Sequence, residues 1–184
     1  MHRYLWVLLL WPLWGQAAEV HTLEVHYVDG ALNVQLDAEL NARVAALRSV
    51  LSDYRNLSLL MPVVQNSKVI AGAPPGWTRV HAELQGCIWI FCRDLDHVMD
   101  VKRDDNGRSL AKTVPGAGDF ASGTIRWHLQ AVGKYRSRLV LNAHLVPDIW
   151  VPPLIGPYLI ERKVRHQFFL AVSRLERAGR RAQR

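Results

Sequence analysis

Two cysteines are the side chains of this 184-residue chain with the clearest chemistry. Cys87 and Cys92 are its only cysteines, and they bracket the apolar run Ile88-Trp89-Ile90-Phe91. Two sulfurs separated by four residues could begin a metal site, but a structural zinc site needs a second pair of ligands, which this region lacks. In an oxidising compartment two cysteines most often pair. We therefore predict a Cys87–Cys92 disulfide and no metal site.

The histidines do not form a recognisable catalytic set. They are scattered singly, and no Ser-His-Asp or Cys-His arrangement can be placed among them. His97 alternates with Leu95 and Met99, so we expect it on an apolar face. It would be either a ligand contact or a satisfied polar side chain of the core. The sequence therefore predicts no catalytic residue.

The first seventeen residues are typical of a secretory signal peptide. Arg3 supplies the positive charge, an apolar stretch runs from Tyr4 to Trp14, and small residues at 15 and 17 fit a cleavage site. The apolar stretch is shorter than the roughly 20 residues of a membrane-spanning helix. We expect a signal peptide at 1–17, one domain at 18–178 and a basic tail at 179–184, in the periplasm. An uncleaved N-terminal anchor is the alternative.

The positive charge is concentrated at the C-terminal end. The chain carries a net charge of +7 at pH 7, and residues 161–184 hold eight Lys and Arg side chains against two Glu. Such a segment can be a solvated helix end, or it can favour anionic phospholipid head groups. Nucleic acid is a poor fit for an exported protein whose charge is not interleaved with surface aromatic residues.

Alternating apolar residues predict antiparallel strands along most of the chain. A hairpin over 20–40 turns at Asp29-Gly30, a dipeptide typical of two-residue turns. Two short helices are expected. Asn41 would cap the first, whose apolar positions are Val44, Leu47, Val50 and Leu51, and the second would run over 54–60, capped by Ser52 or Asp53 and ended by Pro62. The remaining strands are predicted at 63–70, 77–85, 94–101, 110–114, 120–132 and 139–145.

The apolar tip, residues 87–92, falls where the strand pattern requires a hairpin turn. It contains none of the Gly, Asn, Asp or Pro residues that turns usually need. Its side chains suggest a surface that touches a membrane, an apolar ligand or a partner. A bulged stretch of buried strand is the alternative.

A long helix is expected after the tip and the last strands. Pro157 suits its first position, and the periodic pattern ends near Ala178. The apolar face is broad, which is typical of a helix that packs on a sheet. That face includes Leu159, Ile160, Val164, Phe168, Ala171, Val172 and Leu175.

This order of elements resembles the START-like, or helix-grip, fold of the polyketide cyclase and lipid-transport (SRPBCC) superfamily. The coenzyme Q-binding START-like proteins and their ribosome-association-toxin relatives are the nearest branch. The segments that carry the resemblance are Val50-Leu51-Ser52-Asp53-Tyr54, Leu60-Met61-Pro62, Ser67-Lys68-Val69-Ile70, and Val114-Pro115-Gly116 with Phe120, Gly123 and Trp127. The resemblance spans about 32–177.

The resemblance implies an α+β fold in which a curved antiparallel sheet of about seven strands wraps around the C-terminal helix, with two short helices added. Three features depart from the family pattern: the export signal, an extra N-terminal strand and the cysteine-bracketed tip. Export argues against a ribosomal role. The fold alone does not determine the function.

In this fold the space between sheet and helix can hold an apolar ligand, although the same residues would also fill a closed core. We expect a periplasmic binding or carrier protein for a lipid-like or isoprenoid molecule, without a cofactor and with peripheral membrane contact. The residues expected at the ligand are Trp89, Phe91, His97, Phe120, Ile125, Trp127, Leu141, Leu159, Val164 and Phe168.

Two other functions stay open. A cyclase or hydrolase acting on an aromatic or polyketide-like substrate would need polar groups such as His97, Asp119 or Arg126 to converge on one pocket. An envelope interaction module would dock on a partner through the apolar tip, with no cavity behind it. The sequence does not indicate an oligomeric state.

Overall fold

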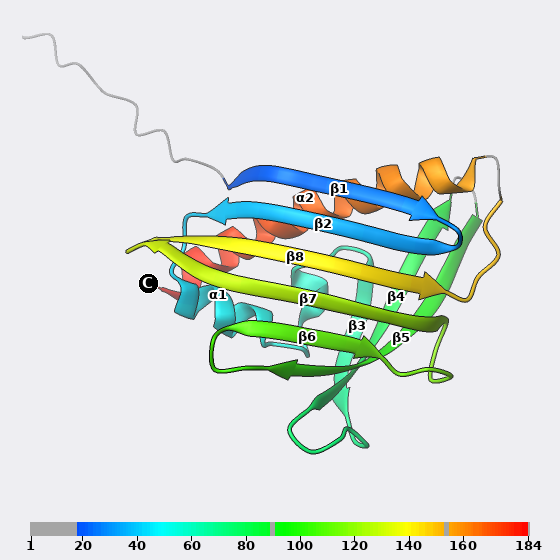
Figure 1. Cartoon of the computed structure of the whole chain (residues 1–184), viewed down its shortest axis with the longest axis horizontal. Coiled ribbons are helices and arrows are strands. Elements are labelled where there is room, and N and C mark those ends of the chain that lie inside the picture. The colour runs from blue at the N-terminus through cyan, green and yellow to red at the C-terminus, as the bar shows by residue number, and fades with distance from the viewer. Residues whose placement is uncertain (1–17, 89–90, 153–154, 184) are drawn as a thin grey trace, which may run out of the picture.

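One antiparallel sheet and one long helix make up most of this protein, as the computed structural model in Figure 1 shows. The structure describes residues 18–88, 91–152 and 155–183. The strands of this described part are β1 (Glu19–Val28), β2 (Ala31–Leu40), β3 (Val64–Ile70), β4 (Thr78–Ile88), β5 (Phe91–Arg103), β6 (Arg108–Thr113), β7 (Phe120–Gly133) and β8 (Arg136–Pro147). The helices are α1 (Val44–Leu51), the short 3-10 helix η1 (Leu57–Leu59) and α2 (Gly156–Ala182).

The sheet curves around α2, which is the predicted helix-grip arrangement of an α+β fold. Its strands follow the order β1-β2-β8-β7-β6-β5-β4-β3, and every neighbouring pair is antiparallel. α2 packs against β1 at one edge and also contacts β4 near the other edge. A sheet that reaches one helix from both sides must bend around it. We call the face that it turns toward α2 the inner face and the opposite one the outer face.

The eight strands of the described sheet match the eight strand ranges predicted from the sequence, and β1, the predicted extra N-terminal strand, pairs with β2 along its length. One detail differs from the prediction. The second predicted helix, over 54–60, forms only the single turn η1. The backbone N–H of Leu57 donates to Ser67 Oγ (3.1 Å) on β3, so it does not enter a helical ladder.

Asn41 does not cap α1 as predicted. The N-cap residue is Arg43, which makes no capping hydrogen bond with its side chain. The backbone N–H of Asn41 instead donates to Glu176 Oε2 (2.9 Å), and its side-chain Nδ2 donates to the same oxygen (3.3 Å). The residue therefore connects the end of β2 to α2, a contact 135 positions away in the sequence.

The predicted disulfide is confirmed at the end of the β4–β5 hairpin. Cys87 and Cys92 are bonded through their sulfur atoms and are also cross-strand partners in the ladder. The ladder continues to the pair Ile88 and Phe91. Strand pairing in the predicted tip thus extends up to residues 88 and 91. The two residues that connect them lie outside the described part.

α2 begins as predicted and ends later. Pro157 occupies its first turn, but the helix continues to Ala182 rather than stopping near Ala178. Gly179 lies in this extra part of the helix, where a Cβ atom would lie 2.6 Å from Leu47 Cδ2 and 3.0 Å from Ala42 Cβ. The glycine lets this last part of α2 pack closely on α1. No helix within the described ranges has the length and hydropathy needed to cross a bilayer.

Polar side chains of α2 attach the helix to the backbone of other elements. Glu161 Oε1 accepts a hydrogen bond from the Tyr27 N–H on β1 (2.9 Å), and Gln167 Oε1 accepts one from the Val63 N–H ahead of β3 (3.1 Å). Together with Glu176, these groups hold α2 from both sides. They fix the position of the helix over the sheet more specifically than apolar packing alone.

The main core lies between β2, β7, β8, α1 and the C-terminal half of α2. Its fully buried members include Leu40 and Leu47, and α2 contributes Val172 and Leu175. A second, smaller cluster around Val25 packs against the N-terminal half of α2. The two halves of α2 are therefore buried to different degrees, which matters for the candidate site.

Candidate functional site

Four of the predicted ligand-contact residues meet on the inner face. Ile125 on β7 and Leu141 on β8 pack with Val164 and Phe168 of α2 around a small buried cluster. β7 and β8 bring the first two together because Ile125 pairs with Ala143 and Leu141 pairs with Trp127 on the same face. Alternation along each strand accounts for this placement. The sequence and the structure agree here.

The apolar residues at this position are only half-buried. Val172 and Leu175, in the C-terminal half of α2, are each 3% exposed, whereas Val164 and Phe168 in the N-terminal half retain partial exposure. Ile125, Leu141 and Trp127 opposite them are also half-buried. Apolar side chains that face each other and still reach solvent form a surface that an apolar molecule can cover.

His97 is a satisfied interior histidine. Its side chain is 4% exposed, its Nε2 atom lies 2.9 Å from Thr113 Oγ1, and its ring centroid lies 4.3 Å from that of Phe120. Burial lowers the pKa of His97 to about 4, so the ring is neutral near pH 7. The bond to Thr113 was not predicted. The β5–β6 register explains this bond. Thr113 pairs with Met99, and Met99 is the next residue after His97 on the same face of β5.

Gly123 makes room for this arrangement on β7. A Cβ atom at Gly123 would lie 2.9 Å from Thr113 Oγ1 and 2.6 Å from Leu145 Cδ2. The glycine therefore lets the Thr113 and Leu145 side chains lie directly against the β7 backbone. Gly123 was part of the family resemblance, and the structure supplies a packing reason for it.

The polar residues named for a catalytic site do not converge. Arg126 neighbours Trp127, which packs into the core, and so its exposed side chain points to the outer face. Asp119 Oδ2 accepts a hydrogen bond from the Asp96 backbone N–H (2.7 Å), outside the interior. His97 is the one member of the three on the inner face. The cyclase or hydrolase constellation is not assembled by these residues.

The remaining predicted contact residues are placed unevenly. Phe120 is buried against His97, Trp127 packs beside the main core, and Leu159 is half-buried in the first turns of α2. The prediction for Trp89 lies outside the described residues. Phe91 contributes its backbone to β5, and its side chain also lies outside the described part.

Exposed apolar side chains gather at the end of the molecule where α2 begins. Trp150 is 80% exposed, Tyr158 is 64% exposed, and Ile155 between them is 52% exposed. The hydrogen bond from Tyr27 to Glu161 places the adjacent end of β1, with its exposed Val28, at the same end. We call Val28, Trp150, Ile155 and Tyr158 the apolar end. The exposed cations Arg162, Lys163 and Arg165 follow within two turns of α2.

Comparison with solved structures identifies the fold. The structure is similar to that of the aromatase/cyclase Zhui from Streptomyces sp. R1128, with a TM-score of 0.68 and 13% sequence identity. The alignment covers 84% of this chain and 96% of Zhui. A STAR-related lipid transfer protein from Xanthomonas axonopodis matches 88% of the chain over 99% of its own, at 14% identity and a TM-score of 0.57. The alignment with human STARD10 covers 86% of this chain and 73% of the STARD10 chain, at 10% sequence identity and a TM-score of 0.58. The chain has a START-like fold.

This START-like fold confirms the resemblance that the sequence motifs indicated, at the level of architecture. No protein-family model matches the sequence, and no curated protein matches it either. The fold is therefore recognised by three-dimensional similarity at low sequence identity. The fold alone does not determine the function.

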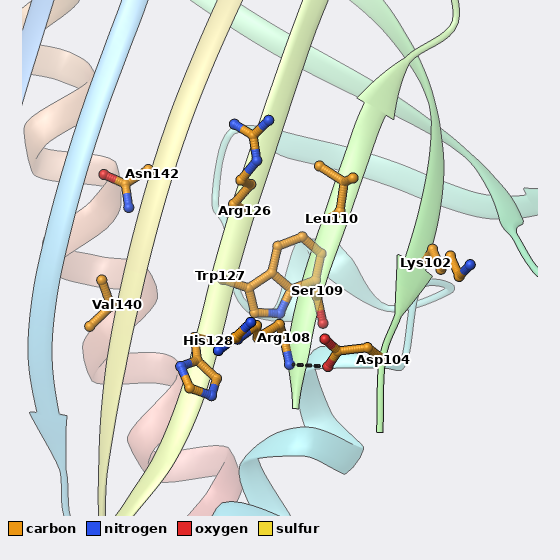
Figure 2. A pocket seen from close by; sticks show the side chains of 10 residues that line it. All are labelled: Lys102, Asp104, Arg108, Ser109, Leu110, Arg126, Trp127, His128, Val140 and Asn142. Carbon is orange, nitrogen blue, oxygen red and sulfur yellow. Dashed lines mark hydrogen bonds between the residues drawn. The ribbon is translucent and has the colours of Figure 1, made fainter. Parts of the chain in front are cut away.

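The START-like domain also has a hollow on its outer face, away from α2. It measures about 350 Å³ and runs across β5, β6, β7 and β8, where Figure 2 shows the side chains along it. No pattern in the sequence indicates this groove. Its lining residues are Lys102, Asp104, Arg108, Ser109, Leu110, Arg126, Trp127, His128, Val140 and Asn142.

The described residues contain no group of three or more His, Cys, Asp or Glu side chains arranged to hold a metal ion. The two cysteines are joined to each other, so neither sulfur is available as a thiolate ligand. The inner face offers apolar contact, and the outer groove offers charged side chains beside apolar ones.

Proposed function

We propose that this protein is an exported carrier for a lipid-like or isoprenoid molecule. The ligand would lie on the inner face, between β7 and β8 on one side and the N-terminal half of α2 on the other. The observation that supports this most directly is the half-burial of facing apolar side chains there, namely Ile125, Leu141, Val164 and Phe168. Covering such side chains fully would contribute about 25 cal/mol per Å² of apolar surface removed from water.

The similar solved structures support the ligand class. Proteins with this fold include a STAR-related lipid transfer protein and an aromatase/cyclase. The first of these agrees with the lipid-like ligand that we propose. For this chain we propose carriage rather than cyclisation, because His97 is buried and bonded to Thr113, and Arg126 points away from the inner face.

Two features support an exported carrier. The N-terminal sequence has the pattern of a secretory signal, and Cys87 and Cys92 are bonded, as is usual in an oxidising compartment. The periplasm is the simplest location that satisfies both.

We also propose that the carrier exchanges its ligand at a membrane, through the apolar end. Trp150 and Tyr158 are mostly exposed there, and amphipathic aromatic side chains favour the membrane interface. Arg162 and Lys163 are exposed close by, and each could add about 1 kcal/mol on an anionic bilayer. The disulfide-linked hairpin of β4 and β5 extends toward the same end of α2 in Figure 1. An apolar ligand could therefore leave the inner face directly into lipid.

Ligand extraction tests the carrier function. Protein purified from its periplasm without detergent is extracted with organic solvent, and the extract is analysed by mass spectrometry. We expect a stoichiometric apolar molecule, which is reduced in a Leu141→Arg variant because a charge in the apolar site is costly. Val132→Arg is the matched control, since Val132 is exposed at the far end of β7.

The folded state of each variant is checked by its thermal unfolding midpoint. If Leu141→Arg unfolds, Leu141→Trp replaces it, because that change fills the space without adding a charge. Native protein that neither retains an apolar molecule nor takes one up from a panel of lipids and isoprenoids would contradict the proposal.

A further inference from the structure

We propose that the groove on the outer face is a second binding site, for a small amphiphilic anion. The ligand class is an apolar chain or ring that bears a phosphate or carboxylate group. This site opens on the face of the sheet opposite to α2, although the inward-facing residues Ser109 and Trp127 also belong to its lining. It does not depend on the carrier function.

Three basic residues line the groove, one from each of three neighbouring strands, and Lys102 lies at its outer edge. Leu110 on β6 pairs with Lys102 on β5 and with Arg126 on β7. The two basic residues therefore lie on either side of this leucine. Arg108 on β6 pairs with His128 of β7 in the next outward-facing row. All three cations are exposed at their ends. Figure 2 shows these side chains along the same stretch of sheet.

No carboxylate neutralises these cations within the described ranges. Elsewhere on the sheet, long basic side chains are paired: Arg79 with Asp100 (2.7 Å) and Arg138 with Asp37 (2.8 Å). Lys102 instead lies over the Trp77 ring, 6.0 Å from its centroid. The neighbouring acid, Asp104, already accepts a hydrogen bond from the Arg108 backbone N–H (2.8 Å). The groove therefore has an excess of positive charge.

The floor of the groove is apolar. Leu110 and Val140 are half-buried at outward-facing positions, among polar neighbours such as Arg126 and Asn142. Both ring nitrogens of His128 already have protein partners, so this side chain only bounds the groove. Its Nε2 lies 3.3 Å from the Asn106 carbonyl oxygen, and its Nδ1 lies 3.1 Å from Gln130 Nε2. An inorganic anion would contact only the basic side chains of the groove. An amphiphilic anion would contact these side chains and also cover the apolar floor.

The size and geometry fit a small ligand. The hollow of about 350 Å³ is near the lower end of the 300–1,000 Å³ typical of small-molecule sites. Arginine side chains bind phosphate and carboxylate through paired N–H donors, and two arginines flank this groove. Asn142 adds an amide at the end of the row, next to Arg126 across the β7–β8 ladder.

The experiment is an NMR titration of the folded, disulfide-bonded protein with octyl phosphate as the probe. We expect backbone amide shifts on β5–β8 that follow a saturable curve, with octanol producing none at these positions. Charge reversal by Arg126→Glu should weaken binding about tenfold or more, and Lys102→Glu should act in the same direction. Arg55→Glu is the matched control, since Arg55 is exposed outside the groove.

Several outcomes would overturn the proposal. These are shifts confined to the inner face, equal affinity of the Arg126→Glu and Arg55→Glu variants, or binding of inorganic phosphate as tight as that of octyl phosphate. A third arm uses vesicles with phosphatidylglycerol. If the vesicles perturb the groove and monomeric octyl phosphate does not, the surface is a membrane contact and the small-ligand site is refuted. Loss of octyl phosphate binding in the Leu141→Arg variant would also refute an independent site.

Discussion

The Nε2 atom of His97 lies 2.9 Å from Thr113 Oγ1, on the inner face where β5 meets β6. The two side chains satisfy each other in a setting that is otherwise apolar, with the Phe120 ring on one side. Burial holds the pKa of His97 at about 4, below its usual 6.5. The imidazole is therefore a neutral structural group at pH 7, and protonating it would place an unpaired charge in the interior.

We predict that stability falls with acidification because of His97. Its pKa is lower in the folded than in the unfolded state, so the unfolded state binds more protons between pH 6.5 and 4. The contribution of neutral His97 to the free energy of unfolding is fully present above about pH 6.5. It declines by up to roughly 3 kcal/mol as the pH falls toward 4. Urea unfolding at pH 7 and pH 4.5 measures it.

A His97→Gln variant should lose most of this pH dependence, although its stability at pH 7 is lower. His144→Gln is the control, because His144 is exposed and bonded to Asn33 (2.8 Å). An unchanged slope in His97→Gln would show that other groups produce the acid sensitivity.

The disulfide should be complete in native protein. Alkylation without reductant, followed by intact-mass measurement, should add no label to Cys87 or Cys92, since both sulfurs are bonded. Replacing both cysteines by serine should lower the free energy of unfolding by roughly 2 kcal/mol, the amount expected for so short a loop. Two labelled thiols in freshly isolated protein would contradict the pairing.

Close packing at the end of α2 predicts a large effect at Gly179. A side chain there would meet Leu47 Cδ2 at 2.6 Å, so Gly179→Val should destabilise the protein by about 1–3 kcal/mol through overpacking. Ala182→Val is the matched control, because it places the same side chain at an exposed position of the same helix. Equal unfolding free energies for the two variants would refute the packing argument.

The apolar end should bind anionic membranes. Trp150→Ser combined with Tyr158→Ser should weaken binding to phosphatidylglycerol vesicles about tenfold or more, since each exposed aromatic ring loses its burial in lipid. The thermal midpoint should hardly change, because the two side chains are 80% and 64% exposed. Vesicle sedimentation provides the measurement.

Val132→Ser combined with Tyr135→Ser is the control for this experiment. Both residues are exposed, and they lie at the β7–β8 turn, at the other end of the sheet in Figure 1. Equal loss of vesicle binding in both double variants would mean that contact is not specific to the apolar end. An unfolded Trp150→Ser/Tyr158→Ser variant would contradict the exposure on which the proposal depends.

Much of this fold follows from local patterns in the sequence. Alternation along a strand decides which side chains share a face, and it correctly placed Ile125, Trp127 and Leu141 together and His97 inside. The apolar face of α2 had to be buried, and the predicted sheet offered a large apolar surface to receive it. Two cysteines at the end of one hairpin could meet without any long-range information.

Only the tertiary structure decided which residues from distant segments become neighbours. Asn41 was predicted to cap a helix, yet it bonds to Glu176, because α2 lies beside the end of β2. The outer groove depends on the register of β5, β6 and β7, which sets Lys102, Leu110 and Arg126 in one row. Alternation gives the face of a residue but not its partner across the ladder, since register is determined by long-range packing.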